Sequence, residues 1–171
     1  SERFSKNERF GFFPSIGGGW YISNEAFWND NLKKVISKLK LKATYGLVGN
    51  DAIGSASDRF FYISEVNMQN GGKGAYFGSK RNEHYNGISI SRYPNDQITW
   101  EVAKKLNLGI ELGVCDQLEV IADVFWEKRK NILMERSYIP STMGLQAAIR
   151  ANVGEAKSRG IDISANYSKF F

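Results

Sequence analysis

The sequence predicts an all-β fold, namely an antiparallel up-and-down segment of a transmembrane β-barrel. Residues 38–47, 106–114 and 161–167 alternate apolar and polar side chains, most regularly in 106–114, where five aliphatic residues alternate with Asn, Gly, Glu and Gly. Successive side chains of a strand point to opposite faces, so each segment has one apolar and one polar face, whereas a helix would scatter its leucines. Strands of about 9–11 residues with two such faces are what a transmembrane barrel requires.

The amino-acid composition excludes several other classes of protein. The 171 residues correspond to one domain, and no stretch approaches the 18 apolar residues of a transmembrane helix. A mean hydropathy of −0.38 is compatible with a membrane barrel, because the two faces of each strand average out. The net charge of +5 is spread along the chain, which argues against a nucleic-acid partner. The single cysteine, Cys115, excludes an internal disulfide, and we expect it to be a small turn residue.

About five long strands are expected, joined by connectors of unequal length. A tight turn at 115–117 separates the third strand from the fourth, and Pro14 fits best at a strand end or bulge. The connector 23–37 holds a possibly helical stretch at 32–36. The expected strands are residues 11–22, 38–48, 98–114, 118–133 and 157–168.

Two long connectors, 49–97 and 134–156, leave the end of the strands opposite the tight turn. The first includes a turn signal at 70–74 and short β-prone pieces at 59–63 and 75–77, so loop hairpins are expected there. Long loops at one end and a short turn at the other are typical of outer-membrane barrels. Aromatic residues near strand ends resemble the two girdles of such a barrel; they are Trp20, Tyr21, Trp100, Phe125, Trp126 and Tyr167.

Five segments also carry more specific motifs. Residues 9–16 read RFGFFPSI before Gly19 and Trp20, and residues 39–46 read LKLKATYG. The other three are 98–110, 118–133 and 152–162. In this order, and over nearly the whole chain, they resemble the barrel segments of SusC/RagA-type TonB-dependent transporters from Bacteroidetes-like Gram-negative outer membranes.

This resemblance implies that residues 1–171 are a single segment from the C-terminal part of a larger plugged barrel of about 22 strands. It implies import of glycan oligomers or peptides, a SusD-like surface lipoprotein as partner, and energy from TonB. The plug and the TonB-contacting segment would lie in the parent, outside these residues. The first and the last residues of the sequence both have the residue pattern of a β-strand, and no signal-peptide pattern is present. We therefore expect the sequence to be a fragment of a longer protein.

We do not expect this segment to catalyse a reaction. Glu111, Glu119 and Asp123 lie on neighbouring strands and in principle two carboxylates could flank a glycosidic bond. The simpler interpretation is that these carboxylates are structural residues of the polar face, either solvated or paired with Lys40 and Lys42. His84 is the single histidine, which rules out a multi-histidine metal site, and no cofactor motif is present. We therefore predict no enzyme, no metal and no cofactor.

The alternation assigns side chains to the two faces of the barrel wall. Expected to face the lipid bilayer are Leu39, Leu41, Ala43, Leu106, Leu108, Ile110, Leu112, Leu118, Val120, Ile161 and Ile163. Expected to face the lumen or plug are Lys40, Lys42, Asn107, Glu111, Glu119, Asp123, Asp162 and Ser164.

Candidate substrate-binding residues are exposed aromatics of the long loop, because sugars bind aromatic faces flanked by amides and carboxylates. The alternative is that these aromatics pack the loop against itself or against a partner lid. The candidates are Tyr62, Tyr76, Phe77, Tyr85 and Tyr93, with Glu111 and Asp123 in the lumen, and Phe61 belongs to the same aromatic group.

Two other functions stay open on the sequence. One is a passive porin-like or adhesin barrel without TonB coupling, which an upstream plug would exclude. The other is a soluble carbohydrate-binding β-sandwich, which stable solubility of this piece without detergent would favour. A strip of barrel wall has two open edges and an apolar face, so we expect the isolated segment to aggregate.

Overall fold

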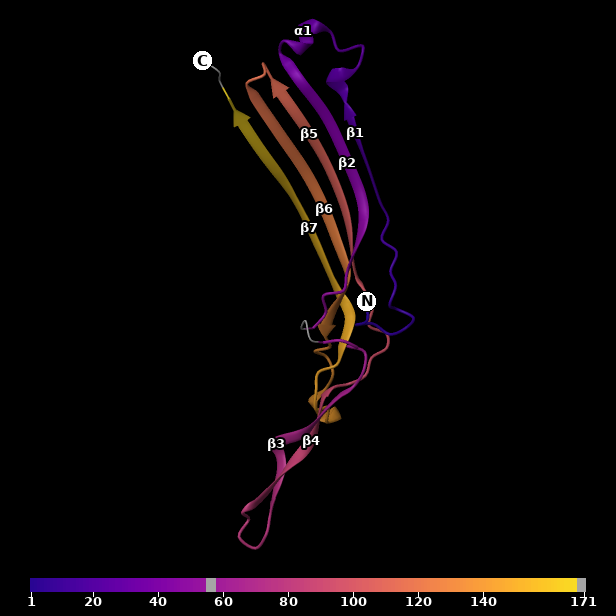
Figure 1. The fold of residues 1–171 in the computed structure, drawn as a ribbon, viewed down its shortest axis with the longest axis vertical. Helices are drawn as coiled ribbons and strands as arrows, with labels where there is room; N and C mark the ends of the chain where they lie inside the picture. Colours follow the sequence, from indigo (N-terminus) through magenta and orange to yellow (C-terminus); the bar gives the residue numbers. More distant parts are fainter. Residues whose placement is uncertain (55–57, 169–171) are drawn as a thin grey trace. The chain divides into compact units, whose positions relative to one another are not determined.

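The computed structural model of the chain describes residues 1–54 and 58–168, and these form an almost purely β structure (Figure 1). The strands are β1 (Ser15–Tyr21), β2 (Ile36–Asn50), β3 (Glu65–Phe77), β4 (Glu83–Arg92), β5 (Glu101–Val114), β6 (Leu118–Glu135) and β7 (Arg150–Tyr167). Helical structure is limited to the short α1 (Asp30–Lys33) and two 3-10 turns, η1 (Ile22–Asn24) and η2 (Ser141–Met143). No helix in this described part of the chain has the length and apolar character needed to cross a membrane.

The strands form two sheets. A five-stranded sheet has the order β1-β2-β5-β6-β7, and β3 pairs with β4 in a separate antiparallel hairpin. Neighbours in the large sheet follow chain order once the hairpin is set aside, which confirms the predicted up-and-down arrangement with a loop hairpin.

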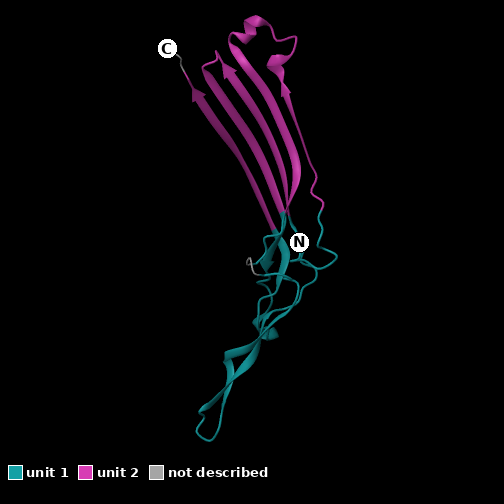
Figure 2. Ribbon diagram, viewed as in Figure 1, with its two compact units in different colours: residues 1–11, 50–101, 130–154 teal, residues 12–49, 102–129, 155–171 magenta. Residues whose placement is uncertain are grey.

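The chain divides into two compact units, shown in different colours in Figure 2. Residues 12–49, 102–129 and 155–171, here called the sheet unit, hold β1 and most of β2, β5, β6 and β7. Residues 1–11, 50–101 and 130–154, here called the loop unit, hold the β3–β4 hairpin.

The sheet unit has two chemically distinct faces. The register of β1 against β2 places Ile16 opposite Tyr45 and Trp20 opposite Leu41, so these four side chains share one face. This apolar face stays open along its length: Ile163 is 71% exposed and Ile161 is 66% exposed. Large exposed side chains on the apolar face are Ile16, Trp20, Leu41, Tyr45, Leu108, Ile110, Trp126, Ile161, Ile163 and Tyr167.

The tight turn between β5 and β6 has the backbone of a two-residue hairpin loop. Cys115 and Asp116 both have left-handed backbones, with φ of 51° and 55°. The amide of Gln117 donates to the carbonyl of Val114 at 3.1 Å, which closes the turn. Two consecutive left-handed residues match the twist of the flanking strands, so the predicted turn at 115–117 is confirmed.

Three of the predicted girdle residues do not lie on the apolar face. Trp100 packs against the core of the loop unit. Tyr21 lies opposite Lys40 in the register of β1 and β2 and shares the polar face of that lysine, and Phe125 lies on the polar face as well. A Cβ placed on Gly160 would come within 2.5 Å of the Cζ of Phe125, so the Phe125 ring covers the backbone of β7 at this glycine. Phe125 follows the period of Asp123 and Glu127, and it therefore belongs to the polar face. The aromatic ring fills the space that the missing side chain of Gly160 leaves.

The loop unit has a small core of its own. Phe4, Ile53, Phe61 and Ile98 are buried together, with Trp100 and Leu133 packed against them. The Trp100 indole lies 5.2 Å from the Phe4 ring and donates to the carbonyl of Glu8 at 3.0 Å. These contacts fix the first residues of the chain to the connector between β2 and β5.

Two local predictions in this connector are wrong. The glycine run at 70–74 lies inside β3, where the register against β4 shifts between Asn67 and Asn70 and again before Ala75. Glycines inside a strand mark bulges as readily as turns. The hairpin reverses at 78–82 instead, where Gly78 and Arg81 have positive φ. Residues 59–63 are not a strand either, because Phe60 is left-handed and Ile63 bonds back to its carbonyl at 3.0 Å.

Strand ends also differ from the prediction. β1 begins at Ser15 rather than at residue 11, and Pro14 lies just before it, at a strand end as expected. β7 begins at Arg150, seven residues before the predicted start at 157. β5 begins at Glu101 because the side-chain amide of Asn152 bonds both the amide and the carbonyl of Thr99, at 3.0 and 2.9 Å. The predicted strand-like end at 169–171 lies outside the described residues.

Candidate functional site

Charged side chains of the polar face meet in one cluster on the three central strands of the sheet unit. Glu111 of β5 lies in the middle and contacts three lysines of β2. Its carboxylate oxygens are 2.9 Å from the Nζ of Lys38, 3.6 Å from that of Lys40 and 3.8 Å from that of Lys42. The lysines alternate along β2, so period-two geometry places all three on the face of Glu111.

Two carboxylates of β6 complete this cluster, which we call the charge ladder. Glu119 binds Lys38 at 2.8 Å and Asp123 binds Lys42 at 3.1 Å. The members of the ladder are Lys38, Lys40, Lys42, Glu111, Glu119 and Asp123, three cations and three anions. The predicted pairing with Lys40 and Lys42 is confirmed for Glu111 and Asp123, whereas Glu119 pairs with Lys38 instead. The cluster as a whole carries no net charge.

The geometry of the ladder differs from that of a glycosidase acid–base pair. An acid–base pair for glycoside cleavage needs one carboxylic acid kept protonated and a second carboxylate free to attack or to activate water. Each carboxylate of the ladder instead forms an ion pair with a lysine of β2. Among the described residues, no three His, Cys, Asp or Glu side chains gather as a metal site.

Glu111 should matter more to stability than the other carboxylates of the ladder. Its side chain is 14% exposed and has three cationic neighbours, whereas Glu119 is 41% exposed. We expect Glu111→Gln to lower the free energy of unfolding of the whole folded protein by about 1–3 kcal/mol, between the values for surface and buried pairs. The matched variant Glu119→Gln should cost less than about 1 kcal/mol. Denaturant titration in detergent measures both, and equal losses would contradict the central role of Glu111.

A second candidate region lies in the loop unit, as a pocket of about 600 Å³. The guanidinium groups of Arg92 and Arg150 lie 4.6 and 5.9 Å from the ring centre of Phe61. Arg92 also contacts the carboxylates of Asp58 at 3.5 Å and Glu65 at 3.3 Å. The remaining polar lining comes from Ser91, Tyr93, Asn95, Gln97, Glu135, Arg136 and Gln146.

Side-chain to backbone bonds hold this pocket together. The side-chain amide of Asn95 donates to the backbone carbonyl of Arg150 at 2.9 Å. The backbone N–H of Gln146 donates to the Tyr93 hydroxyl at 3.2 Å. The side-chain oxygen of Gln146 also accepts a hydrogen bond from the backbone N–H of Ile90 at 2.7 Å. The connector between β6 and β7 is thereby bound to the end of β4.

The structure distributes the sequence-predicted site residues over separate places. Tyr93 lies in the loop-unit pocket, and the half-buried Tyr62 lies outside that pocket's lining. The ring centre of Tyr76 lies 4.5 Å from that of His84, with the two rings tilted by 51°. Phe77 meets Tyr85 edge-on, with the ring centres 5.7 Å apart, and all four residues belong to the β3–β4 hairpin. Glu111 and Asp123 belong to the charge ladder of the sheet unit.

The sequence places Phe61 among the exposed aromatics of the long loop, and this prediction is wrong because the residue is only 2% exposed. Sequence reasoning also missed Arg92 and Arg150, whose guanidinium groups cover that ring. The sequence of a polar loop does not show whether an aromatic residue in it is buried or exposed. The alternation that identifies strand faces gives no signal in the irregular segment around Phe61.

Comparison with known proteins places this geometry in a family. The family model described as "TonB dependent receptor-like, beta-barrel" matches residues 1–171. The chain is 30% identical over 167 residues both to TonB-dependent receptor P3 of Formosa agariphila and to TonB-dependent receptor SusC of Bacteroides thetaiotaomicron. Each match covers 97% of this chain, and 15% and 16% of the relative, respectively.

A solved structure agrees with the sequence matches. The RagAB peptide importer in the closed-closed state superposes with a TM-score of 0.76 at 26% identity, covering 99% of this chain and 17% of that one. The chain thus spans about a sixth of the length of the relatives it matches, and the predicted fold class is confirmed. The 171 residues belong to the TonB-dependent receptor-like β-barrel family.

Proposed function

We propose that this segment is part of the wall of an outer-membrane importer that takes up glycan oligomers or peptides with energy from TonB. A SusD-like surface lipoprotein would act with the parent protein at its outer end. The observation that carries the proposal is the contrast between the faces of the sheet unit. One face is exposed and apolar, and the other is charged and internally neutralised.

In this proposal the apolar face contacts lipid and the polar face lines the lumen. An unpaired row of lysines would attract anions and repel cations, whereas the charge ladder presents alternating signs to a passing solute. The segment would therefore provide a polar, unselective wall, and no bond chemistry is proposed for it. In the loop unit, Tyr93 and Arg136 line the same pocket and are the groups that we propose contact cargo.

Two parts of the proposal rest on relatives. RagAB is described as a peptide importer, which supports peptides as one cargo class. SusC is described as a TonB-dependent receptor, which supports the energy source. The glycan alternative and the lipoprotein partner rest on the family resemblance of the sequence.

Uptake by cells that express the whole parent protein tests the proposal. Labelled oligosaccharides and labelled peptides of graded length would be supplied with and without a functional TonB, and uptake of one class should be lost without TonB. Affinity purification of the parent in mild detergent should bring down a surface lipoprotein. Uptake that continues without TonB would favour the passive porin-like alternative instead.

A further inference from the structure

The apolar face of the sheet unit ends at one level on three neighbouring strands. On β5 the alternate residues are aliphatic through 106–112 and the next is Lys104. On β7 they are apolar through 161–167 and the next are Arg159 and Lys157. On β6, Val124 and Trp126 are followed by Lys128. Because alternate residues share a face, these cations lie on the same side of the sheet as the aliphatic residues.

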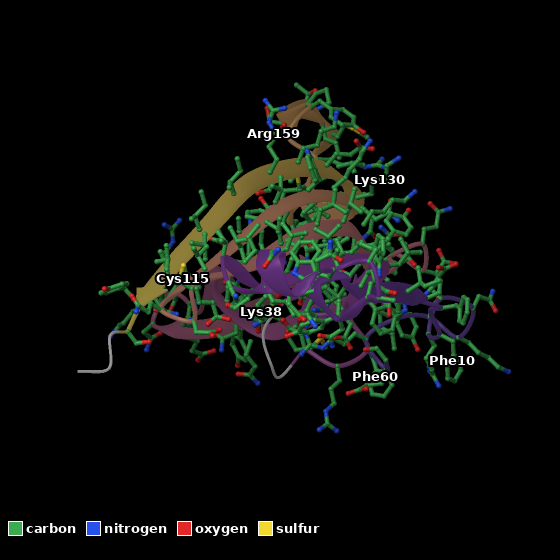
Figure 3. The ribbon with its side chains drawn as sticks, turned by 90° about the horizontal axis from the view of Figure 1, so that it is seen from above. Phe10, Lys38, Phe60, Cys115, Lys130 and Arg159 are labelled. Carbon is green, nitrogen blue, oxygen red and sulfur yellow. The ribbon has the colours of Figure 1, made fainter. Side chains whose placement is uncertain are left out.

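The cations surround a groove on this face, here called the basic groove. The groove has a volume of about 550 Å³, and Tyr45 and Trp126 contribute aromatic walls. The cationic residues of its lining are Lys104, Lys105, Lys128, Lys157 and Arg159, and the lining also includes Glu127. By the period of their strands, Lys105 and Glu127 belong to the polar face, whereas the other four cations belong to the apolar face. Arg159 is in period with Ile161 and Ile163 of β7, whereas Lys38 lies on the face of Glu111, so the basic groove and the charge ladder occupy different faces. Both residues are labelled in Figure 3.

Charge balance differs between the two faces. In the charge ladder every lysine lies within 4 Å of a carboxylate. In the basic groove, Lys128 contacts Glu155 at 3.4 Å and Lys105 contacts Glu127 at 3.6 Å. Within the part of the chain that the structure describes, Lys104, Lys157 and Arg159 form no ion pair. Three cations on the apolar face therefore lack an anionic partner from the protein.

The position of the groove along the strands matches the edge of a bilayer. From Val114, beside the tight turn, to Lys104 a strand advances roughly 33 Å, which is about 25 Å of height at a tilt of about 40°. The apolar band of a membrane barrel is about 25 Å tall and is bounded by aromatic residues. Tyr45 and Trp126, 50% and 41% exposed, have the amphipathic rings that favour this level.

We propose that the basic groove binds the phosphate of a phosphorylated glycolipid in the outer leaflet, with the lipid's acyl chains lying along the apolar face. This inference rests on the proposed function, because it requires the end of the strands opposite the tight turn to be the outer end. Cargo does not explain the groove, since it lies on the face away from the charge ladder. Unpaired lysines and an arginine bordering an apolar surface are the side chains that recognise anionic lipid headgroups.

Lipid binding by the purified parent protein tests the proposal. The probes are diphosphorylated lipid A, the same lipid after enzymatic dephosphorylation, and inorganic phosphate alone, each titrated against the protein in mild detergent. Native mass spectrometry counts bound lipid. We expect lipid A to bind, and the dephosphorylated lipid and free phosphate to bind at least roughly tenfold more weakly.

Matched variants locate the site. The triple variant Lys104→Gln, Lys157→Gln, Arg159→Gln should weaken lipid A binding by roughly tenfold or more. The control Lys33→Gln, Lys34→Gln, Lys80→Gln removes the same charge from exposed positions outside the groove and should bind as the native protein does. The charge-retaining variant Lys104→Arg, Lys157→Arg, Arg159→Lys should also keep binding, and heat-modifiable mobility on gels confirms that each variant is folded.

The possible results separate the two proposals. Equal binding of lipid A by the glutamine variant and the native protein would overturn the groove assignment, as would equal binding of the dephosphorylated lipid. Neither result concerns TonB-dependent uptake. Conversely, uptake that persists without TonB would overturn the importer while leaving the lipid titration unaffected.

Discussion

Leu108→Arg is expected to impair insertion of the parent protein, lowering its stability in the membrane by about 2–4 kcal/mol. Leu108 lies on the apolar face of β5, well within the aliphatic stretch that ends at Lys104, and its side chain is 43% exposed. An arginine there would place a charge near the bilayer centre, where no water can solvate it. The fraction of protein that reaches the outer membrane, and its heat-modifiable mobility on gels, measure the effect.

The neighbouring variant Asn107→Arg is the matched control. Asn107 precedes Leu108 in β5 and therefore points to the other face, beside Asp123 and Glu127. The same arginine should be tolerated there with a change of about 0.5 kcal/mol or less, because the polar face is solvated and carries nearby carboxylates. If Asn107→Arg blocked assembly and Leu108→Arg did not, the assignment of the two faces would be reversed.

The depth dependence of this effect can be read on the same strand. Lys104 already occupies the apolar face of β5, four residues from Leu108, at the level where Trp126 marks the edge of the aliphatic band. In the proposed membrane orientation a cation is tolerated there, because the cost of a charge on the lipid face falls toward the interface. The natural sequence thus already places a cation on the apolar face of β5, but at the edge of the aliphatic band rather than at its centre.

Much of the sheet unit follows from its sequence because period two is a strong local signal. The alternation of residues 106–114 fixes which side chains share a face, and the polar residues at 115–117 require a reversal. The pairing of Glu111 with lysines of β2 depends on a fact that no local pattern contains. β2 lies beside β5 although the connector 51–100 separates them in the chain.

The loop unit could not be predicted in the same way. Its core assembles residues from the N-terminal segment, the connector after β2 and the end of β6, with Phe4 and Leu133 as the extremes. Contacts between irregular segments leave no periodicity, so Phe61 and Tyr62 look alike in the sequence although Phe61 alone is in the core. The glycines at 71–74 are ambiguous for a related reason, since the same residues permit either a turn or a bulged strand.

Phe61→Ala is expected to unfold the loop unit while leaving the sheet unit in place. Phe61 is 2% exposed and shares the core with Phe4, Ile53 and Ile98. Removing a buried phenylalanine ring costs about 3–5 kcal/mol, and this small core offers few neighbours that could close the cavity. The variant also removes the ring on which Arg92 lies at 4.6 Å, so the pocket loses the surface that positions this guanidinium.

Hydrogen exchange and limited proteolysis of the whole folded protein distinguish a local from a global effect. Residues 50–101 should exchange and be cleaved much faster in Phe61→Ala, whereas residues 102–114 of β5 should keep their protection, because stability is distributed in separate cooperative units. The control Phe77→Ala removes the same ring from the β3–β4 hairpin, where the side chain is 55% exposed, and should change stability by about 0.5 kcal/mol or less. Loss of protection in both regions together would mean that the two units unfold as one. Equal behaviour of the two variants would mean that the core around Phe61 does not hold the loop unit together.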